Sequence, residues 1–348
     1  MLTNCLGGSS VKTQTQIVLD HDSASLDYEH QTRQINMVTN SDGVIAITTS
    51  DDSVATGSYS NGVVTISCVD SAGECDITIH VLESLQYTAY QTTVSVTSTA
   101  VFKTFDQATD AELVTMVNAA DAGKIDLYDD CGWRVEQERT ISIGATPAIR
   151  TSLGNDHAAQ SVVFTLMHKG QKRLTTSVLN KDGTTRNTCS FIVGMKDCLA
   201  ENDIASYSNS DSNNNGWNNS YSRSWCNNSF KNAIPSNIRS LFKQFVNITG
   251  KLDGGTESVT TNDYFSLYAE KEMFGSSTYA DSTAEGNLFQ FAYNATHKTK
   301  KVGSSNSIYW ERSTGGGSKA GYTLCVTAGG SPDYASGQNY GISVYGCI

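Results

Sequence analysis

The sequence predicts a mainly β protein in two parts, a small β-sandwich followed by a larger α+β domain. Two patterns indicate this. Over residues 13–85, short segments rich in β-branched residues alternate with Asp-Gly, Asn-Gly and Ala-Gly turns. From residue 101 onward, helical periodicity appears among further strand-like segments. The chain of 348 residues is long enough for two or three domains, each with its own core.

Residues 1–12 are small and polar, and we expect a loose arm there. The segments that follow predict strands spaced by roughly ten residues; they are QIVLD, QINMVT, GVIAITTS, GVVTISCVD and CDITIHVL. This spacing is typical of a small antiparallel sandwich, to which we assign residues 13–85. Residues 86–100 are rich in Thr, Ser and Val. We expect them to form a linker, with a pair of strands as the alternative.

One stretch of the first domain carries a family pattern. Residues 46–81, AITTSDDSVATGSYSNGVVTISCVDSAGECDITIHV, resemble the bacterial immunoglobulin-like group 2 domain. In that family an S-D-x-S-V-A strand leads to N-G-x-V-T and then to a closing G-x-x-x-I-T-V strand. Here these are Ser50–Ala55, Asn61–Thr65 and Gly73–Val81. The resemblance implies an immunoglobulin-like sandwich that serves as a spacer or attachment module and performs no chemistry.

Residues 101–348 predict an α+β domain that begins with a helix. The segment TDAELVTMVNAADAGK has a capping box in Thr109 and Glu112, and Gly123 is suited to end the helix. GWRVEQERTISIG predicts a hairpin-like pair of strands. The apolar runs QSVVFTLMHKG and CSFIVGM predict buried strands.

The second half of this domain predicts further helices and a return to strands. After an Asn- and Ser-rich loop, a helix is expected near Arg223–Phe230, and PSNIRSLFKQF (235–245) predicts an amphipathic helix. DYFSLYAEKEMFG predicts a strand and then a short helix that ends at Gly275. The last expected strands are SIYWERS, GYTLCVTA and GISVYGCI.

Five motifs of the second domain follow in order: GWRVEQERTISI, GWNNSYSRSWCNNSFKNAIPSNIRSLFK, DYFSLYAEKEMFG, YWERS and GISVYGCI. This order resembles an uncharacterised domain family of Firmicutes and their phages, whose members carry L-L-S-x-x-E-x-F-G and W-L-R-S. The resemblance implies the C-type-lectin-like fold that is shared with formylglycine-generating enzymes and with the variable proteins of diversity-generating retroelements. We expect its signature residues to pack inside as a scaffold; these are Trp225, Phe230, Trp310 and Arg312. We also expect Arg223 to pair with Glu272.

The candidate binding residues are those that such a scaffold would display. In C-type-lectin-like proteins the region between the last two strands faces the ligand, and here it is rich in Tyr, Ser and Asn, as antibody paratopes are. The candidates are Tyr322, Asp333, Tyr334, Gln338, Asn339 and Tyr340, with Ser331 and Ser336 beside them. A second candidate patch consists of Trp217, Asn218 and Tyr221.

Composition and motifs argue against several other functions. The net charge is −11 and is concentrated in residues 1–100, where 11 acidic side chains face 2 basic ones. This charge disfavours nucleic acid and anionic membranes as partners. No cofactor or metal site is expected, because zinc-binding spacings are lacking and the calcium-lectin motif W-N-D is replaced by WNN at 217–219. The sequence also lacks nucleophile-elbow and phosphate-loop motifs, and we expect mostly free, buried thiols among its nine cysteines.

These observations predict a non-enzymatic virion surface protein of a bacteriophage: a head fibre, capsid decoration or tail-tip adhesin. Only 17% of the residues are charged, so neutral polar residues must cover much of the surface. The first residues lack a signal peptide, and we expect folding in the host cytoplasm and release by lysis. The N-terminal region would contact other virion proteins in a homo-oligomer, and the lectin-like domain would bind a host-surface glycan or protein. The alternatives are a bacterial cell-surface adhesin and a formylglycine-generating-enzyme-like oxidoreductase that uses Cys325 and Cys347.

Overall fold

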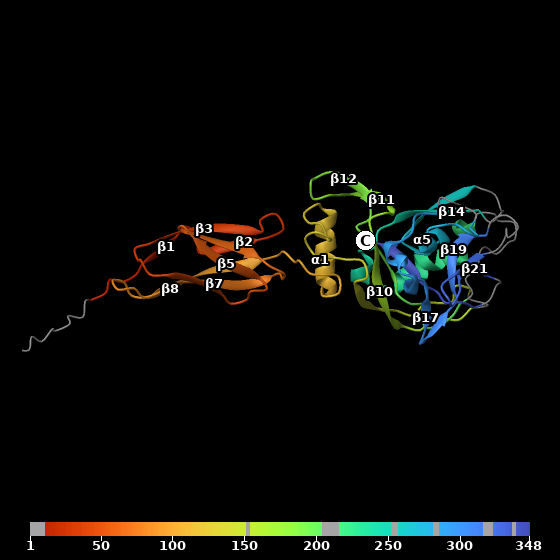
Figure 1. Cartoon of the computed structure of the whole chain (residues 1–348), viewed down its shortest axis with the longest axis horizontal. Helices are drawn as coiled ribbons and strands as arrows, with labels where there is room; N and C mark the ends of the chain where they lie inside the picture. The colour runs from red at the N-terminus through yellow and green to blue at the C-terminus, as the bar shows by residue number, and fades with distance from the viewer. Residues whose placement is uncertain are drawn as a thin grey trace, which may run out of the picture. The chain divides into compact units, whose positions relative to one another are not determined.

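The computed structural model describes residues 11–150, 154–203, 216–251, 257–280, 285–315, 323–335 and 339–348. The chain divides into two compact units, Met1–Lys103 and Thr104–Ile348 (Figure 1). The protein is mainly β, with 43% strand and 15% helix in several sheets, as the sequence predicted. Most of the expected N-terminal arm, 1–10, lies outside the described residues. Within the described residues, no helix is long and apolar enough to cross a membrane.

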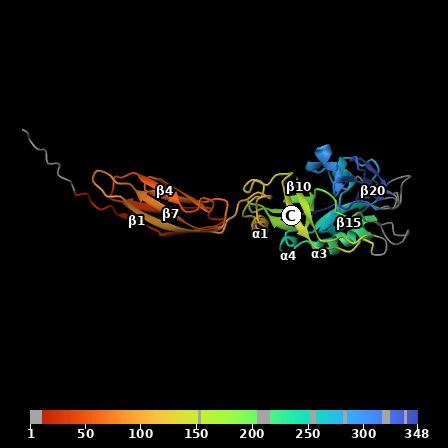
Figure 2. The ribbon, with the colours of Figure 1, turned by 90° about the horizontal axis from the view of Figure 1, so that it is seen from below.

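The first unit consists of two four-stranded sheets (Figures 1 and 2). One sheet has the order β1 (Ile17–Leu19), β3 (Thr32–Thr39), β6 (Val63–Cys68) and β5 (Ala55–Ser60). The other has the order β2 (Ser23–Leu26), β8 (Tyr90–Ser98), β7 (Gly73–Val81) and β4 (Ile45–Thr49). A tight turn joins β5 to β6 at Asn61 and Gly62, which both have positive φ, as the Asn-Gly signal predicted.

One apolar core belongs to both sheets of this unit. Along β7, alternate side chains point inward, so Ile77 and Ile79 are fully buried beside Ile35 of β3 and Val64 of β6. Each such side chain stabilises the fold by about 1.5–3 kcal/mol relative to its exposed state. The alternation of apolar and polar residues along the strands therefore produces the core between the two sheets.

Two expectations for the first unit need correction. The segment 86–100, expected to be a linker, contains β8, a nine-residue strand that pairs with β7 along its whole length. The sandwich is also not purely antiparallel, because β2 pairs with β8 in parallel. Val94 and Val96 of β8 are buried in the core, and their burial recruits this segment into the sheet.

The second unit opens with helix α1 (Asp110–Asp121), which confirms the first predicted helix. Thr109 and Glu112 form both halves of the capping box, and Gly123 has the positive φ of a helix stop. Leu113 and Val117 are buried on its inner face.

A five-stranded sheet forms the centre of this unit, and most of its strands are apolar and buried. Its order is β16 (Phe265–Leu267), β22 (Val344–Cys347), β13 (Phe191–Met195), β10 (Gln160–Lys169) and β9 (Glu138–Ile143). β13 and β22 are buried at every residue, as the apolar run of CSFIVGM predicted for β13. Only one strand, β9, forms in GWRVEQERTISIG instead of the expected pair.

Two further sheets and a hairpin surround the central sheet. One sheet has the order β12 (Thr185–Thr188), β11 (Arg173–Leu179), β14 (Phe245–Gly250) and β15 (Ser258–Asp263). The other consists of β19 (Tyr309–Thr314), β20 (Thr323–Val326) and β21 (Pro332–Ala335), and the hairpin of β17 (Lys300–Val302) and β18 (Ser305–Ser307). Some strands of the second unit pair with strands distant in the sequence, as β22 does with β13 and β16.

The helices of the second unit are short, and one prediction was wrong. A helical run covers η1 (Gly216–Asn219), α2 (Tyr221–Trp225), η2 (Cys226–Phe230) and α3 (Lys231–Ala233), which confirms the helix expected near Arg223–Phe230. The helix expected over 235–245 is only α4 (Ser236–Arg239). Phe245 instead begins β14, although Ile238, Leu241 and Phe242 are buried as their spacing suggested. Helix α5 (Glu270–Phe274) ends at Gly275 as expected, and η3 (Gln290–Tyr293) and η4 (Ala295–Lys298) complete the set.

Candidate functional site

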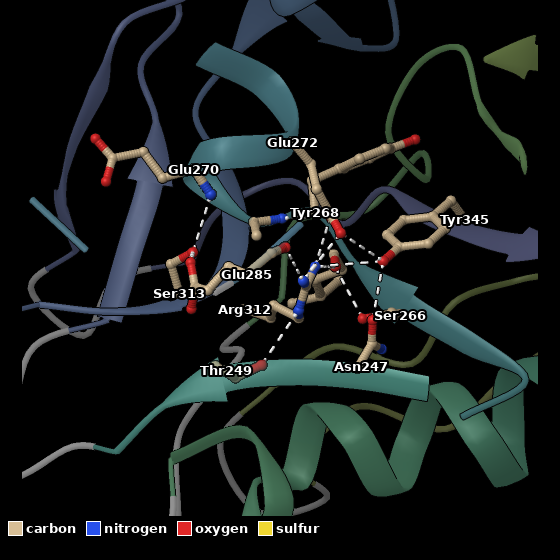
Figure 3. A network of polar contacts seen from close by, with 12 residues as sticks. Asn247, Thr249, Ser266, Tyr268, Glu270, Glu272, Glu285, Arg312, Ser313 and Tyr345 are labelled. Atoms are coloured by element: carbon tan, nitrogen blue, oxygen red, sulfur yellow. Dashed lines mark hydrogen bonds and ion pairs between the residues drawn. The ribbon is translucent and has the colours of Figure 1, made fainter. Parts of the chain in front are cut away.

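Arg312 lies in the middle of β19 and is completely buried, at the centre of a polar network (Figure 3). Its guanidinium donates two hydrogen bonds, of 2.6 and 2.9 Å, to the Glu272 carboxylate. It also donates hydrogen bonds to the carbonyl oxygens of Leu267 and Glu285, to the Thr249 hydroxyl and to the Tyr345 hydroxyl. Every N–H of the planar head therefore meets an acceptor, which is the condition under which a buried arginine is tolerated.

Glu272, the partner of Arg312, comes from the first turn of α5. Its Oε2 also accepts a 2.9 Å hydrogen bond from the backbone N–H of Ala269 at the start of that helix. Its Oε1 accepts from Lys172 and from the Tyr345 hydroxyl at 3.1 Å. Burial raises the pKa of this carboxyl, but Arg312 and Lys172 outweigh it and hold the pKa below its usual range. Burial lowers the pKa of Lys172, which Glu272 partly opposes.

The network continues from Lys172 through Asn247 to Asp263. Lys172 donates to the Asn247 side-chain oxygen at 3.1 Å, and the Asn247 amide donates to Asp263 at 2.8 Å. Asp263 also accepts from the Trp217 indole N–H at 2.8 Å and from Arg223 at 2.6 Å. Arg223 therefore pairs with Asp263, and the expected ion pair between Arg223 and Glu272 was wrong. The scaffold expectation is confirmed, because Trp225, Phe230, Trp310 and Arg312 are all buried.

Glu285 adds a second buried carboxyl beside Arg312 (Figure 3). Its side chain accepts a hydrogen bond from Ser313, which neighbours Arg312 on β19, and its backbone carbonyl accepts from Arg312 at 2.9 Å. Burial raises the pKa of Glu285 to about 7, against the opposing effect of Arg312. This group therefore titrates near neutral pH inside the protein.

A third buried carboxyl, Glu270, organises a surface loop. Its two oxygens accept the backbone N–H groups of Thr278, Tyr279 and Ala280 at 2.7–3.2 Å. Figure 3 shows that its carboxylate points away from Arg312, while its own backbone N–H donates to Ser313. Glu270 thus fixes the loop that carries Tyr279.

Tyr279 meets the first of the expected binding residues, Tyr334 on β21. The two rings lie edge to face with centroids 4.7 Å apart. β21 pairs with β20, and it places Asp333 and Tyr334 on a strand, whereas the sequence suggested a loop. The strand alternation turns these two neighbouring side chains to opposite faces of the sheet.

Tyr340 rests on the buried signature residue Trp310. Their ring centroids are 4.9 Å apart. The Tyr340 backbone forms a reciprocal pair of hydrogen bonds with Asp203, whose carbonyl also accepts the Trp310 indole N–H at 2.9 Å. Trp310 thus connects the core to the surface on which Tyr340 and Asn339 lie. We refer to Asp333, Tyr334, Asn339 and Tyr340 together as the β20–β21 surface, which includes residues from both faces of β21.

The expected binding residues differ in exposure. Asp333 and Asn339 are exposed, and Tyr334, Tyr340 and Tyr221 are half-buried. Tyr221 lies under the Arg150 guanidinium, 5.5 Å from its ring centroid. Trp217 is only 1% exposed and donates to Asp263, so its assignment to a surface patch is corrected. Tyr322, Ser336 and Gln338 lie outside the described residues.

Sequence reasoning missed the organising residues Glu270, Lys172 and Asn247. Glu270 could have been recognised from the segment AEKEMFG. Residues two apart on a helix point in different directions, so the two glutamates of this segment should have different partners. Lys172 and Asn247 gave no local signal, since each stands alone on a distant strand.

The eight cysteines within the described residues are free, and six of them are buried. Cys325 lies on β20 and Cys347 on β22, in different sheets. Burial raises the pKa of the Cys325 thiol to about 12. Among the described residues, no group of three His, Cys, Asp or Glu side chains is placed to hold a metal ion.

Comparison with known proteins locates one family match. Residues 189–344 match the family described as "Domain of unknown function (DUF6273)". No curated protein matches the chain. No immunoglobulin-like or lectin-like family model is found. The matched range contains Glu272, Trp310 and Arg312, so the Arg312 network falls within the part of the chain that is similar to this family.

Proposed function

We propose that the protein is a non-enzymatic binding protein of a phage virion surface, in which the β20–β21 surface contacts a glycan or protein of the host cell. The observation that carries this proposal is the contrast between the buried residues of β19 and the polar and aromatic residues at the surface around it. Arg312 and Trp310 of that strand are buried and saturated with contacts. Tyrosines and an exposed Asn and Asp lie around it at the surface.

The Arg312 network favours binding over catalysis. A catalytic group must reach a substrate. The ionisable groups of the Arg312 network are instead buried, and they form hydrogen bonds with one another. Partly exposed tyrosines offer large contact area at small cost in conformational entropy, and Asn and Asp add adaptable hydrogen bonds. The redox alternative is disfavoured because Cys325 and Cys347 are free thiols on separate sheets.

The two units have separate roles in this proposal. The first unit is an immunoglobulin-like spacer that attaches to other virion proteins, and the second is a lectin-like module. Two sheets around one core in the first unit, and short helices with several small sheets in the second, are compatible with these folds. The acidic first hundred residues would face basic surfaces on neighbouring virion proteins. A homo-oligomer would multiply weak contacts with the host surface.

The proposal is tested with the fluorescently labelled full chain on intact cells of the bacterium in which the protein is produced. We expect saturable binding that falls about tenfold or more in Tyr334→Ser, and measurably in Asn339→Ala, as for interface hot spots. Tyr90→Ser is the matched control, because Tyr90 is a 41% exposed tyrosine of the first unit. Binding that survives both surface variants, or no binding to cells, would overturn the proposal.

Immunogold labelling separates the virion from the adhesin alternative. A virion protein is expected on particles released by lysis and not on the surface of intact, uninduced cells. Labelling of intact, uninduced cells would favour the bacterial adhesin.

A further inference from the structure

A surface hollow of about 340 Å³ lies on the second unit, on elements other than the β20–β21 surface. Its volume is in the range of small-molecule sites. Strands β9, β10 and β17, the residues directly after β13, and helices η3 and η4 contribute to it. The side chains that matter here are Glu136, Glu138, Thr165, Lys196, Asp197 and His297.

His297 lines this hollow, and its ring contains a hydrogen-bond acceptor. Its Nδ1 lies 2.8 Å from the carbonyl oxygen of Phe291, and a carbonyl can only accept, so Nδ1 carries the proton. In the neutral ring, Nε2 is then left as an acceptor. The imidazole is stacked on the Phe291 ring, with centroids 5.1 Å apart and planes 7° apart. The hollow thus has an aromatic wall.

Thr165 is the second polar feature of the hollow. This residue is 4% exposed, and its Oγ1 has no hydrogen-bond partner among the described residues. It pairs with Glu138 across β9 and β10, so both side chains stand on one face of the sheet. A buried hydroxyl without a partner is costly, and a bound polar ligand would remove that cost.

Carboxylates outnumber ammonium groups around the hollow. Glu138 is already paired with Lys196 at 2.8 Å, which leaves Glu136 and Asp197 against Lys301 among the residues that line the hollow. Asp197 also interacts with the buried ammonium group of Lys300 behind the lining. One Asp197 oxygen accepts the backbone N–H of Lys301. Glu136 has a φ of +76°, a strained conformation that favours glycine, and its carboxylate lies 3.6 Å from His297 Nδ1.

We propose that this hollow binds the primary ammonium group of a small organic ligand. An ammonium has three donors and no acceptor, which matches a site rich in acceptors: Glu136, Thr165 Oγ1 and His297 Nε2. The site goes beyond the proposed host contact, because its residues lie outside the β20–β21 surface.

The test uses n-butylammonium, with butan-1-ol and butyrate as neutral and anionic probes of the same length. The full chain is titrated while the ring signals of His297, identified by their loss in His297→Asn, are followed by NMR. We expect saturable shifts with n-butylammonium alone, and an affinity about tenfold lower in Glu136→Gln, which removes a charge-assisted contact. Equal shifts with butan-1-ol or butyrate, or no shift with n-butylammonium, would refute the proposal.

Thr165→Val distinguishes a ligand contact from a structural role. Removing an unpaired buried hydroxyl is expected to leave the melting temperature unchanged or raised, while affinity for n-butylammonium falls. Thr140→Val, at an exposed position of β9, is the matched control and should bind as the unmodified chain does. Tyr334→Ser should also leave this binding intact, so failure of the host-contact proposal remains separable. Full affinity in both Glu136→Gln and Thr165→Val would contradict the assignment.

Discussion

Arg312 and Glu272 face each other in the interior of the second unit through two parallel hydrogen bonds, and neither side chain is exposed to solvent. Arg312 comes from the segment YWERS of β19 and Glu272 from the segment AEKEMFG, 40 residues earlier. The pair therefore joins β19 to the start of α5. Removing one partner of such a buried pair destabilises the fold by more than the intact pair stabilises it, because the other charge stays buried without an opposite charge beside it.

Arg312→Lys should destabilise the second unit by about 3 kcal/mol or more. Lysine keeps the charge but cannot reproduce the two-pronged contact with Glu272 or reach the several other acceptors. All four tryptophans belong to the second unit, so urea unfolding followed by tryptophan fluorescence reports this unit alone. The control is Arg239→Lys, whose guanidinium donates to Asn232 near the surface, with an expected change within about 0.5 kcal/mol. A similar small change for Arg312→Lys would contradict the structural role.

Glu311→Leu should stabilise the same unit by about 1–3 kcal/mol. Glu311 is buried, and neither carboxyl oxygen has a hydrogen-bond partner among the described residues. Burial, reinforced by Glu270, raises its pKa well above the usual range, so the group is held protonated. Glu257→Leu, at an exposed position, is the control, and a loss of stability in Glu311→Leu would show that the carboxyl has an unrecognised partner.

The sequence predicted elements whose determinants are local and missed those set by distant contacts. The α1 helix follows from Thr109, Glu112 and Gly123 alone, and the buried strands follow from continuous apolar runs. The helix expected over 235–245 failed because Phe245 gains more as the first residue of β14, where it is fully buried beside Tyr345. Helix propensity and spacing are local, so they do not account for this competition between a helix and a strand at Phe245.

The candidate site shows the same limit. That Trp310 and Arg312 would be buried could be predicted from a family motif of bulky residues. The partner of Arg223 could not, because Asp263 and Glu272 are both acidic, both buried and only nine residues apart. Which carboxylate meets which arginine depends on how β15 and α5 pack, and that is a property of the whole unit.

Glu270→Gln should loosen the loop that supports Tyr279. The amide group that replaces the carboxylate has only one acceptor oxygen and would turn N–H donors toward N–H donors of the loop. Hydrogen exchange measured by mass spectrometry should therefore be faster for peptides that contain Thr278, Tyr279 and Ala280. Glu257→Gln serves as the control, and unchanged protection in Glu270→Gln would mean that the loop is held by other contacts.

The stability of the second unit should also depend on Glu285 in a defined pH window. Its pKa is about 7 in the folded protein against 4.5 in the unfolded chain, because burial disfavours the charged form. The folded state therefore binds the extra proton between these values, and stability falls as the pH rises from about 4.5 to 7. A shift of this size corresponds to roughly 3 kcal/mol of destabilisation by the ionised group above pH 7.

Glu285→Gln should remove this pH-dependent cost, because glutamine can keep an acceptor for Ser313 and carries no charge. Urea unfolding at pH 5 should give similar stability for the variant and the unmodified protein, whereas at pH 8 the variant should be more stable. The difference between the two curves isolates Glu285 from other titrating groups, since they are common to both proteins. The backbone carbonyl of Glu285 still accepts from Arg312 in the variant. A variant less stable at pH 8 than at pH 5, relative to the unmodified protein, would mean that the ionised carboxylate is stabilised by Arg312 and that burial does not dominate.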